Sequence, residues 1–153
     1  MGVFQDFVGR FAKTMTSYIG DRALMEAAVS AAANVILADY EIDEEEIEAA
    51  LAGMRANPIL EKGYDTLMLE AELYDGIARA RTRAGRAENL RHAAALADRP
   101  QAQRENVFLI AADVADQDGI SGIEAVALAE IAAALGVDGN ALLGASPVGR
   151  PAP

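Results

Sequence analysis

The chain has 153 residues and a formal net charge of −11, and 52% of its residues are hydrophobic while only 5% are aromatic. This length fits one domain with a core of small aliphatic side chains, and so acidic a surface repels phosphate backbones, which argues against nucleic-acid binding. The absence of cysteine excludes disulfides, zinc–thiolate sites and thiol nucleophiles.

The sequence carries no sign of membrane insertion. Residues 1–19 are rich in phenylalanine, but Asp6, Arg10 and Lys13 interrupt the continuous apolar stretch that a signal peptide needs. No other stretch approaches the roughly 20 apolar residues of a membrane-spanning helix. We therefore expect a cytoplasmic protein.

Apolar residues recur at spacings of three and four through almost the whole chain, which is typical of helices. The first predicted helix lies within residues 1–19 and ends at Gly20. The second, at about 22–38, is apolar on every side, which indicates a central position. An acidic loop at 39–43 leads into a third helix at about 44–56.

The middle of the chain continues this pattern. Asn57 followed by Pro58 predicts the cap and first turn of a short helix, which ends at Gly63. A longer helix is expected over about 65–83, and Gly85 is expected to separate it from the next.

Three further helices are predicted at about 87–97, 100–115 and 122–135, and a second acidic loop at 116–120 precedes the last of them. Gly136 is expected to end that helix. No segment alternates apolar and polar residues as a half-buried strand does, so the sequence predicts an all-α fold.

The chain is expected to divide into a helical domain at 1–140 and a flexible tail at 141–153, because the tail contains proline and glycine and little to bury.

Two segments of the domain resemble each other. The sequence AANVILADYEIDEEEIEAAL at 32–51 is similar to LIAADVADQDGISGIEAVAL at 109–128. Aligning Ile42 with Ile120 also aligns Glu46 with Glu124. The loop aspartates match only after a shift of one residue. The chain therefore contains two pseudo-repeated units, each a helix, an acidic loop and a helix.

These units gather most of the notable carboxylates, and capping explains part of them. Asp43-x-x-Glu46 and Ser121-x-x-Glu124 both have the form of a capping box. Carboxylates in a first turn also favour the helix dipole, by about 0.3–1 kcal/mol each.

Capping does not explain the carboxylates that precede the caps. Asp39, Glu41, Asp116 and Asp118 follow the C-terminal ends of apolar helices, where the helix dipole disfavours an anion. Crowded carboxylates also repel each other, and a hard cation such as Ca²⁺ or Mg²⁺ would reverse that repulsion. The candidate metal ligands are Asp39, Glu41, Glu46, Asp116, Asp118 and Glu124.

The second loop is not an EF-hand. Asp116-x-Asp118-Gly119 mimics part of such a loop, but the first and twelfth positions would be Val114 and Ala125, which cannot bind a cation.

The paired motif resembles the TerB family of tellurite-resistance proteins over about residues 2–140. That family's pattern is an apolar helix ending in Ala-x-Asp-Gly, then a β-branched residue, then a glutamate that opens the next helix, in two copies. The copies here lie at 38–46 and 115–124. Tyr40 stands where the first copy usually has glycine, and Asp118 is shifted by one residue in the second.

The resemblance implies a compact bundle of about seven helices with two acidic motifs meeting at one surface. It further implies a non-catalytic, divalent-cation-binding module, linked to calcium, in a bacterial stress-response system. Its partners would be other tellurite-resistance-type proteins, including a membrane-bound one that could hold it at the inner membrane.

Two other functions remain open from the residues. One is a helical protein-interaction scaffold that binds no metal, and the other is a carboxylate-dependent metallohydrolase. With His92 as the only histidine and no cysteine, a nucleophile–base pair is hard to assemble. Seven arginines between Arg79 and Arg104 are either solvated helix faces or a basic docking surface.

Overall fold

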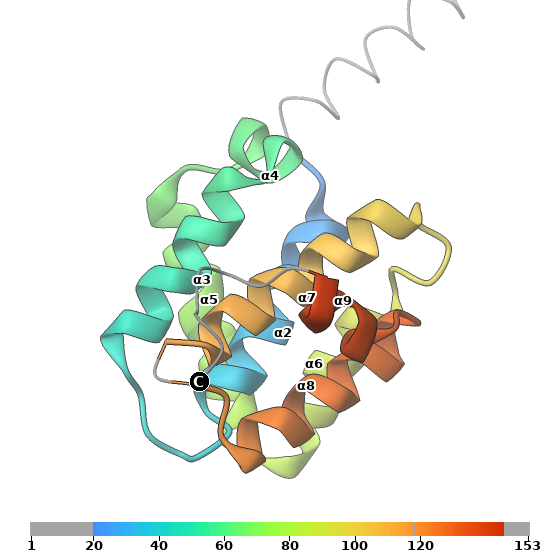
Figure 1. Ribbon diagram of the computed structural model, residues 1–153. Helices are drawn as coiled ribbons and strands as arrows, with labels where there is room; N and C mark the ends of the chain where they lie inside the picture. The colour runs from blue at the N-terminus through green and yellow to red at the C-terminus, as the bar shows by residue number, and fades with distance from the viewer. Residues whose placement is uncertain (1–19, 118, 146–153) are drawn as a thin grey trace, which may run out of the picture.

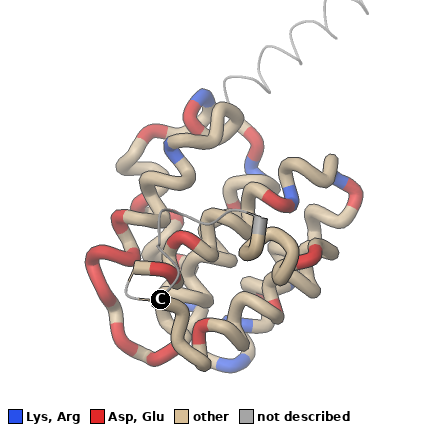
Figure 2. Tube along the Cα trace, in the orientation of Figure 1, with Lys and Arg blue, Asp and Glu red and all other residues tan. Residues whose placement is uncertain are grey.

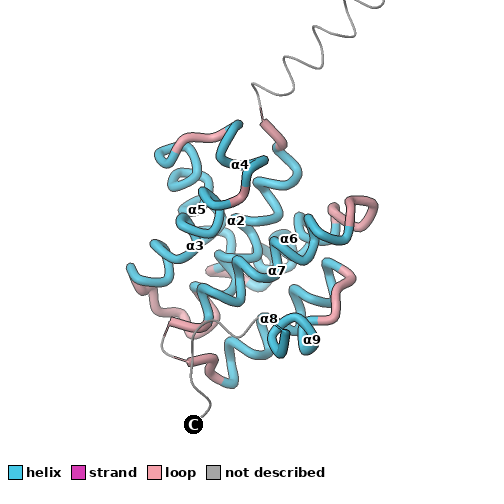
Figure 3. The backbone as a smooth tube through the Cα atoms, turned by 45° about the horizontal axis from the view of Figure 1, so that its top comes forward, coloured by secondary structure: helices cyan, strands magenta, loops and turns pink. Residues whose placement is uncertain are grey.

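The computed structural model describes residues 20–117 and 119–145. All regular elements in these ranges are α-helices, which confirms the predicted all-α bundle (Figures 1 and 3). They are α2 (Arg22–Ile36), α3 (Glu44–Ala56), α4 (Pro58–Gly63), α5 (Thr66–Ala80), α6 (Arg83–Ala94), α7 (Gln101–Ala115), α8 (Gly122–Leu135) and α9 (Gly139–Ala145). The helix expected within residues 1–19 lies outside the described residues.

The second predicted helix, α2, is the centre of the fold. Twelve of its 15 residues are buried, and α5, α6 and α7 pack around it. Its many alanines allow this close packing of helices on all sides, so the prediction of a central position is confirmed. None of the helices in the described part of the chain is both long and apolar enough to cross a bilayer.

The other helices form an outer layer around this centre. α3 and α8 pack on α7, α4 packs on α3, and α6 packs on α8. Phe108 of α7 is fully buried among them. α9 contacts α7 and α8 and runs past residue 140, where the domain was expected to end. Residues 146–153 lie outside the described residues.

Side-chain caps define most helix starts, as the sequence predicts. Asp21, Asp43, Asn57 and Asp65 each accept a backbone N–H of the helix that follows. At the other end of α8, Gly136 has a φ of 69°, the left-handed conformation that commonly ends helices.

The break between α5 and α6 lies at Arg81 and Thr82, so the predicted break at Gly85 is wrong. The Thr82 hydroxyl accepts the N–H of Gly85 at 3.0 Å and caps α6. Gly85 lies inside the first turn of α6, where a Cβ atom would stand only 1.7 Å from the Arg79 carbonyl oxygen. The glycine is required by the close approach of the two helices.

A chain of polar groups joins α2, α5 and α6 inside the bundle. The Arg79 Nε donates to the side-chain oxygen of Asn89 at 2.8 Å, and another Arg79 nitrogen lies 3.4 Å from the Ser30 hydroxyl. The Asn89 amide donates to Asn34 at 2.9 Å and to the Gly76 carbonyl at 3.1 Å. Asn89 is only 1% exposed, so these bonds fix how the three helices meet.

Candidate functional site

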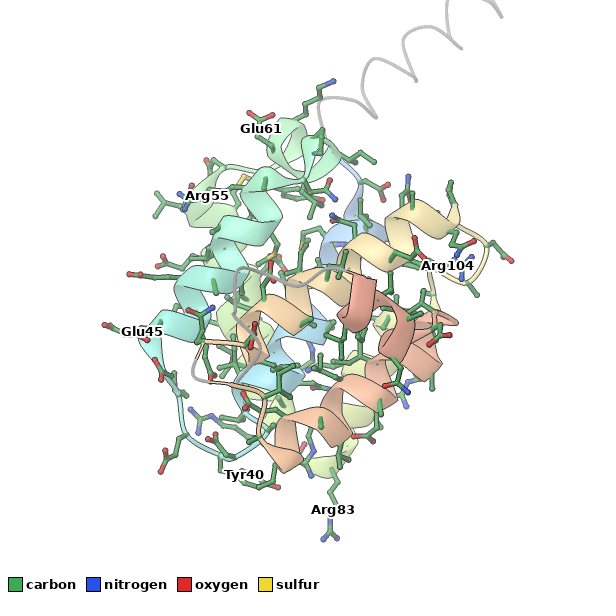
Figure 4. The ribbon with its side chains drawn as sticks, viewed as in Figure 1. Tyr40, Glu45, Arg55, Glu61, Arg83 and Arg104 are labelled. Carbon is green, nitrogen blue, oxygen red and sulfur yellow. The ribbon has the colours of Figure 1, made fainter. Side chains whose placement is uncertain are left out.

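The two acidic loops lie at the same end of the bundle. Two views of the backbone agree that the α2–α3 loop and the loop after α7 lie at this end (Figures 1 and 3). Acidic residues follow the α2–α3 loop and the first turn of α3 (Figure 2). Glu45 in that turn points outward (Figure 4).

The α2–α3 loop is held by its own side chains. The exposed Asp39 accepts the N–H of Glu41 at 3.0 Å, and Asp43 accepts that of Glu45 at 2.9 Å. Between them, Tyr40 has a φ of 63°, a conformation that glycine adopts far more readily. Tyr40 is the residue that stands where the TerB pattern has glycine.

The second loop begins at the end of α7. Asp116 caps the helix through its own N–H, which donates to Ala112 at 3.0 Å. The Gln117 amide nitrogen donates to the Asp113 carbonyl oxygen at 2.8 Å. Asp118 lies outside the described residues, so its predicted role stays a prediction.

A cavity of about 350 Å³ opens between the end of α7 and one face of α3. Asp113, Asp116 and Gln117 line it on the α7 side. The α3 side consists of the small residues Ala49, Ala52 and Gly53. The cavity therefore brings two carboxylates and an amide beside a wall that leaves room for a hydrated ion.

The charges in this cavity repel each other. Asp113 keeps contact with solvent, but partial burial of its carboxyl raises its pKa, and the nearby negative charge of Asp116 raises it further. Both residues also lie at the negative end of the α7 dipole, and none of the described residues that line the cavity is basic. A bound cation would offset the repulsion between the two carboxylates and their unfavourable interaction with the helix dipole.

The raised pKa predicts how acid changes the stability of an Asp113→Asn variant. Because the native state holds the Asp113 proton more tightly than the unfolded chain does, ionisation of Asp113 lowers the free energy of unfolding as the pH rises. We expect Asp113→Asn to be more stable than the wild type at neutral pH in a chelating buffer. The advantage should disappear as the pH falls below the ordinary aspartate pKa of 3.8.

Urea unfolding of both proteins across this pH range measures the effect. If Asp113→Asn were more stable than the wild type by the same amount at every pH, ionisation of Asp113 would not destabilise the native state.

The structure accounts for Glu124 by capping. Glu124 accepts the N–H of Ser121 at 3.0 Å, and the Ser121 hydroxyl accepts the N–H of Glu124 at 3.2 Å, so the predicted capping box is present. Glu46 lies on α3 three and seven residues before Ala49 and Gly53, on the face that lines the cavity. Asp39 and Glu41 are not among the residues that line it.

The described residues bring no three metal-binding side chains together as a ready-made site. The pair that does meet is Asp113 and Asp116, and Asp113 is absent from the six candidate ligands named above. Its signal in the sequence was the spacing of three residues before Asp116 at the end of one helix, which places both on one side of α7.

Comparison of the chain with protein-family models, with curated proteins and with solved structures found no match. The resemblance to the TerB family therefore rests on the two acidic motifs and their spacing in the sequence.

Proposed function

We propose that this protein is a non-catalytic module that binds a divalent cation, Ca²⁺ or Mg²⁺, at the acidic end of its bundle. The observation that supports the proposal best is the pair of Asp113 and Asp116 beside one cavity, where partial burial and, to a lesser extent, the negative charge of Asp116 raise the pKa of Asp113. Anionic and amide oxygens in an open cavity are the donors that these hard cations prefer.

The cation would bind first to the α7 side of the cavity. Asp113 and Asp116 supply negative charge, and Gln117 supplies a neutral amide oxygen, because its nitrogen is already engaged by a backbone carbonyl. The remaining positions would be filled by water, as both ions allow. Glu46 is the nearest candidate ligand on the α3 side by helix position.

The biological setting follows from the resemblance alone. We place the module in a tellurite-resistance-like bacterial stress response, where it would act in the cytoplasm with other tellurite-resistance-type proteins, including one in the membrane. A cation-binding module with His92 as its only histidine and no cysteine, in which a nucleophile–base pair is hard to assemble, fits a role as a sensor or adaptor better than a role in catalysis.

Melting curves with Ca²⁺, with Mg²⁺ and with chelator test the proposal. A cation that binds only the native state should stabilise it by about 2.7 kcal/mol at a hundredfold excess over its Kd. Asp116→Asn should reduce this gain and leave the protein folded. Asp75→Asn, which changes an exposed aspartate on α5, is the matched control and should keep the full gain.

Two further variants separate cation binding from capping. Asp39→Asn reduces the gain only if the first loop also contributes a ligand. Ser121→Ala removes a cap and should cost about 1 kcal/mol with or without cation. If neither ion shifts the wild-type melting temperature at millimolar concentration, the cation proposal is wrong, and a metal-free scaffold becomes the better interpretation.

A further inference from the structure

A second concave surface lies away from the acidic cavity, where the end of α2 meets α6 and α8. It is a groove of about 360 Å³. The residues that matter here are Tyr40, Arg86, Leu90, Ile123, Val126 and Glu130. One wall therefore belongs to α6, the other to α8, and the α2–α3 loop closes one end.

The α8 wall exposes far more apolar surface than a free surface helix usually does. α8 carries only two charged residues, Glu124 and Glu130, yet only four of its 14 residues are buried. Ile123 is 57% exposed, Val126 is 62% exposed, and the neighbouring Tyr40 is 63% exposed. A helix that is apolar on all sides is normally covered, and a joined apolar patch of this kind is typical of an interaction site.

α6 contributes Arg86 and Leu90 to the described lining of the groove, and the contacts of the neighbouring arginines show which of them remain available to a partner. Arg79, Arg99 and Arg104 are engaged inside the protein. Arg79 donates a hydrogen bond to Asn89, and Arg99 forms a salt bridge with Asp21 at the start of α2. Arg104 donates to two backbone carbonyls at the end of α8.

Arg86 lines the groove and is half-buried, whereas Arg81 and Arg83, which precede it in the chain, are exposed. Arg81 and Arg83 form no ion pair with any described carboxylate. Arg86 donates to the Tyr40 hydroxyl at 2.6 Å and lies 5.4 Å from the centre of its ring. Arg83, Arg86 and Leu90 follow each other at helical spacing along one side of α6. Tyr40 and Arg83 lie at the same end of the molecule (Figure 4).

We propose that this groove binds an acidic amphipathic helix of a partner protein. A groove between two helices accepts a third helix through apolar side chains spaced three and four residues apart, and Leu90, Ile123 and Val126 offer the matching apolar surface. Acidic residues beside those anchors would pair with Arg83 and Arg86. The proposal does not depend on the cation site.

Charge and shape favour a helix over an anionic membrane as the partner. A net charge of −11 repels both partners, but a negatively charged bilayer faces the protein over a wide area, whereas a peptide approaches it only at the groove, beside Arg86. The apolar side chains also line a concavity, and a carboxylate, Glu130, stands on the α8 wall. A flat anionic surface cannot reach into a groove of this form without approaching that carboxylate.

Fluorescence anisotropy with two labelled synthetic peptides tests the proposal. The first is a helix with leucines spaced three and four residues apart and glutamates elsewhere. The second has lysine in place of every glutamate. The full-length protein should bind the acidic peptide at least about tenfold more tightly than the basic one, and added salt should weaken the binding.

Variants locate the binding. Arg83→Glu, on the side of α6 that carries Arg86 and Leu90, should weaken binding of the acidic peptide by about tenfold or more. Arg91→Glu, the same change at an exposed position on another side of α6, should not. Val126→Glu should abolish binding, while Leu67→Glu, at a 76% exposed position of α5, should keep it. Circular dichroism of each variant checks that it is folded.

Three results would overturn the proposal. The first is that neither peptide binds, and the second is that Arg83→Glu and Val126→Glu bind as well as their controls do. The third is binding to vesicles of phosphatidylserine and phosphatidylcholine with no binding to the acidic peptide, which would assign the groove to a membrane surface instead.

Discussion

Replacing Gly85 with alanine is expected to destabilise the protein by about 3 kcal/mol. The added Cβ atom would stand 1.7 Å from the Arg79 carbonyl oxygen and 2.9 Å from its Cα atom. Because the obstructing atoms belong to the backbone, the side chain cannot avoid them by changing its rotamer. The first turn of α6 must move away from α5, and the polar contacts between the two helices would be strained with it.

Gly122→Ala is the matched control. Gly122 also lies in the first turn of its helix, α8, but nothing comes within 4 Å of a Cβ atom there. Alanine should stabilise the protein by about 0.4–1 kcal/mol at such a position, because it restricts the unfolded chain. Urea unfolding of the two variants measures both effects. Equal stability of the two would show that α6 can shift without cost.

Asn89→Ala is expected to cost about 3 kcal/mol or more, because it removes a buried group that bonds three partners at once. The Arg79 Nε would lose its acceptor, and the Asn34 side-chain oxygen would lose its donor. An unsatisfied guanidinium nitrogen is the most expensive of these losses, since it carries charge in a partly buried place.

Asn140→Ala supplies the comparison, since Asn140 is an exposed residue of α9, and its loss should change stability by less than about 0.5 kcal/mol. Thermal and urea unfolding report the difference. A loss below about 1 kcal/mol for Asn89→Ala would mean that water replaces the missing amide, and that the polar chain is not needed to join α2, α5 and α6.

The sequence predicts the helices well because their signals are local. The all-round apolar pattern of α2 indicates its central position, and cap residues such as Asp43 and Ser121 mark helix starts within a residue or two. Gly85 misleads for a physical reason: the sequence alone cannot distinguish a glycine that breaks a helix from one that lets a second backbone approach.

The candidate site is less predictable because it depends on how α3 packs on α7. The acidic loops can be recognised in the sequence, and both lie at one end of the bundle. The raised pKa of Asp113 arises from its partial burial in the folded protein and from the charge of Asp116 beside it, in a cavity that α7 shares with α3. The groove between α6 and α8 is likewise a product of tertiary packing, since Arg86 and Val126 are 40 residues apart in the chain.

Tyr40 belongs both to the acidic α2–α3 loop and to the groove, and this has a thermodynamic consequence for any ligand that binds the loop. Its backbone lies in the acidic α2–α3 loop between Asp39 and Glu41, while its ring lines the groove against Arg86. A ligand that reorders this loop therefore alters the end wall of the groove, and a helix seated against the ring restrains the loop. Reciprocity requires the two effects to be equal: the factor by which a cation bound to this loop changes the affinity for the helix is the factor by which the helix changes the affinity of the loop for that cation.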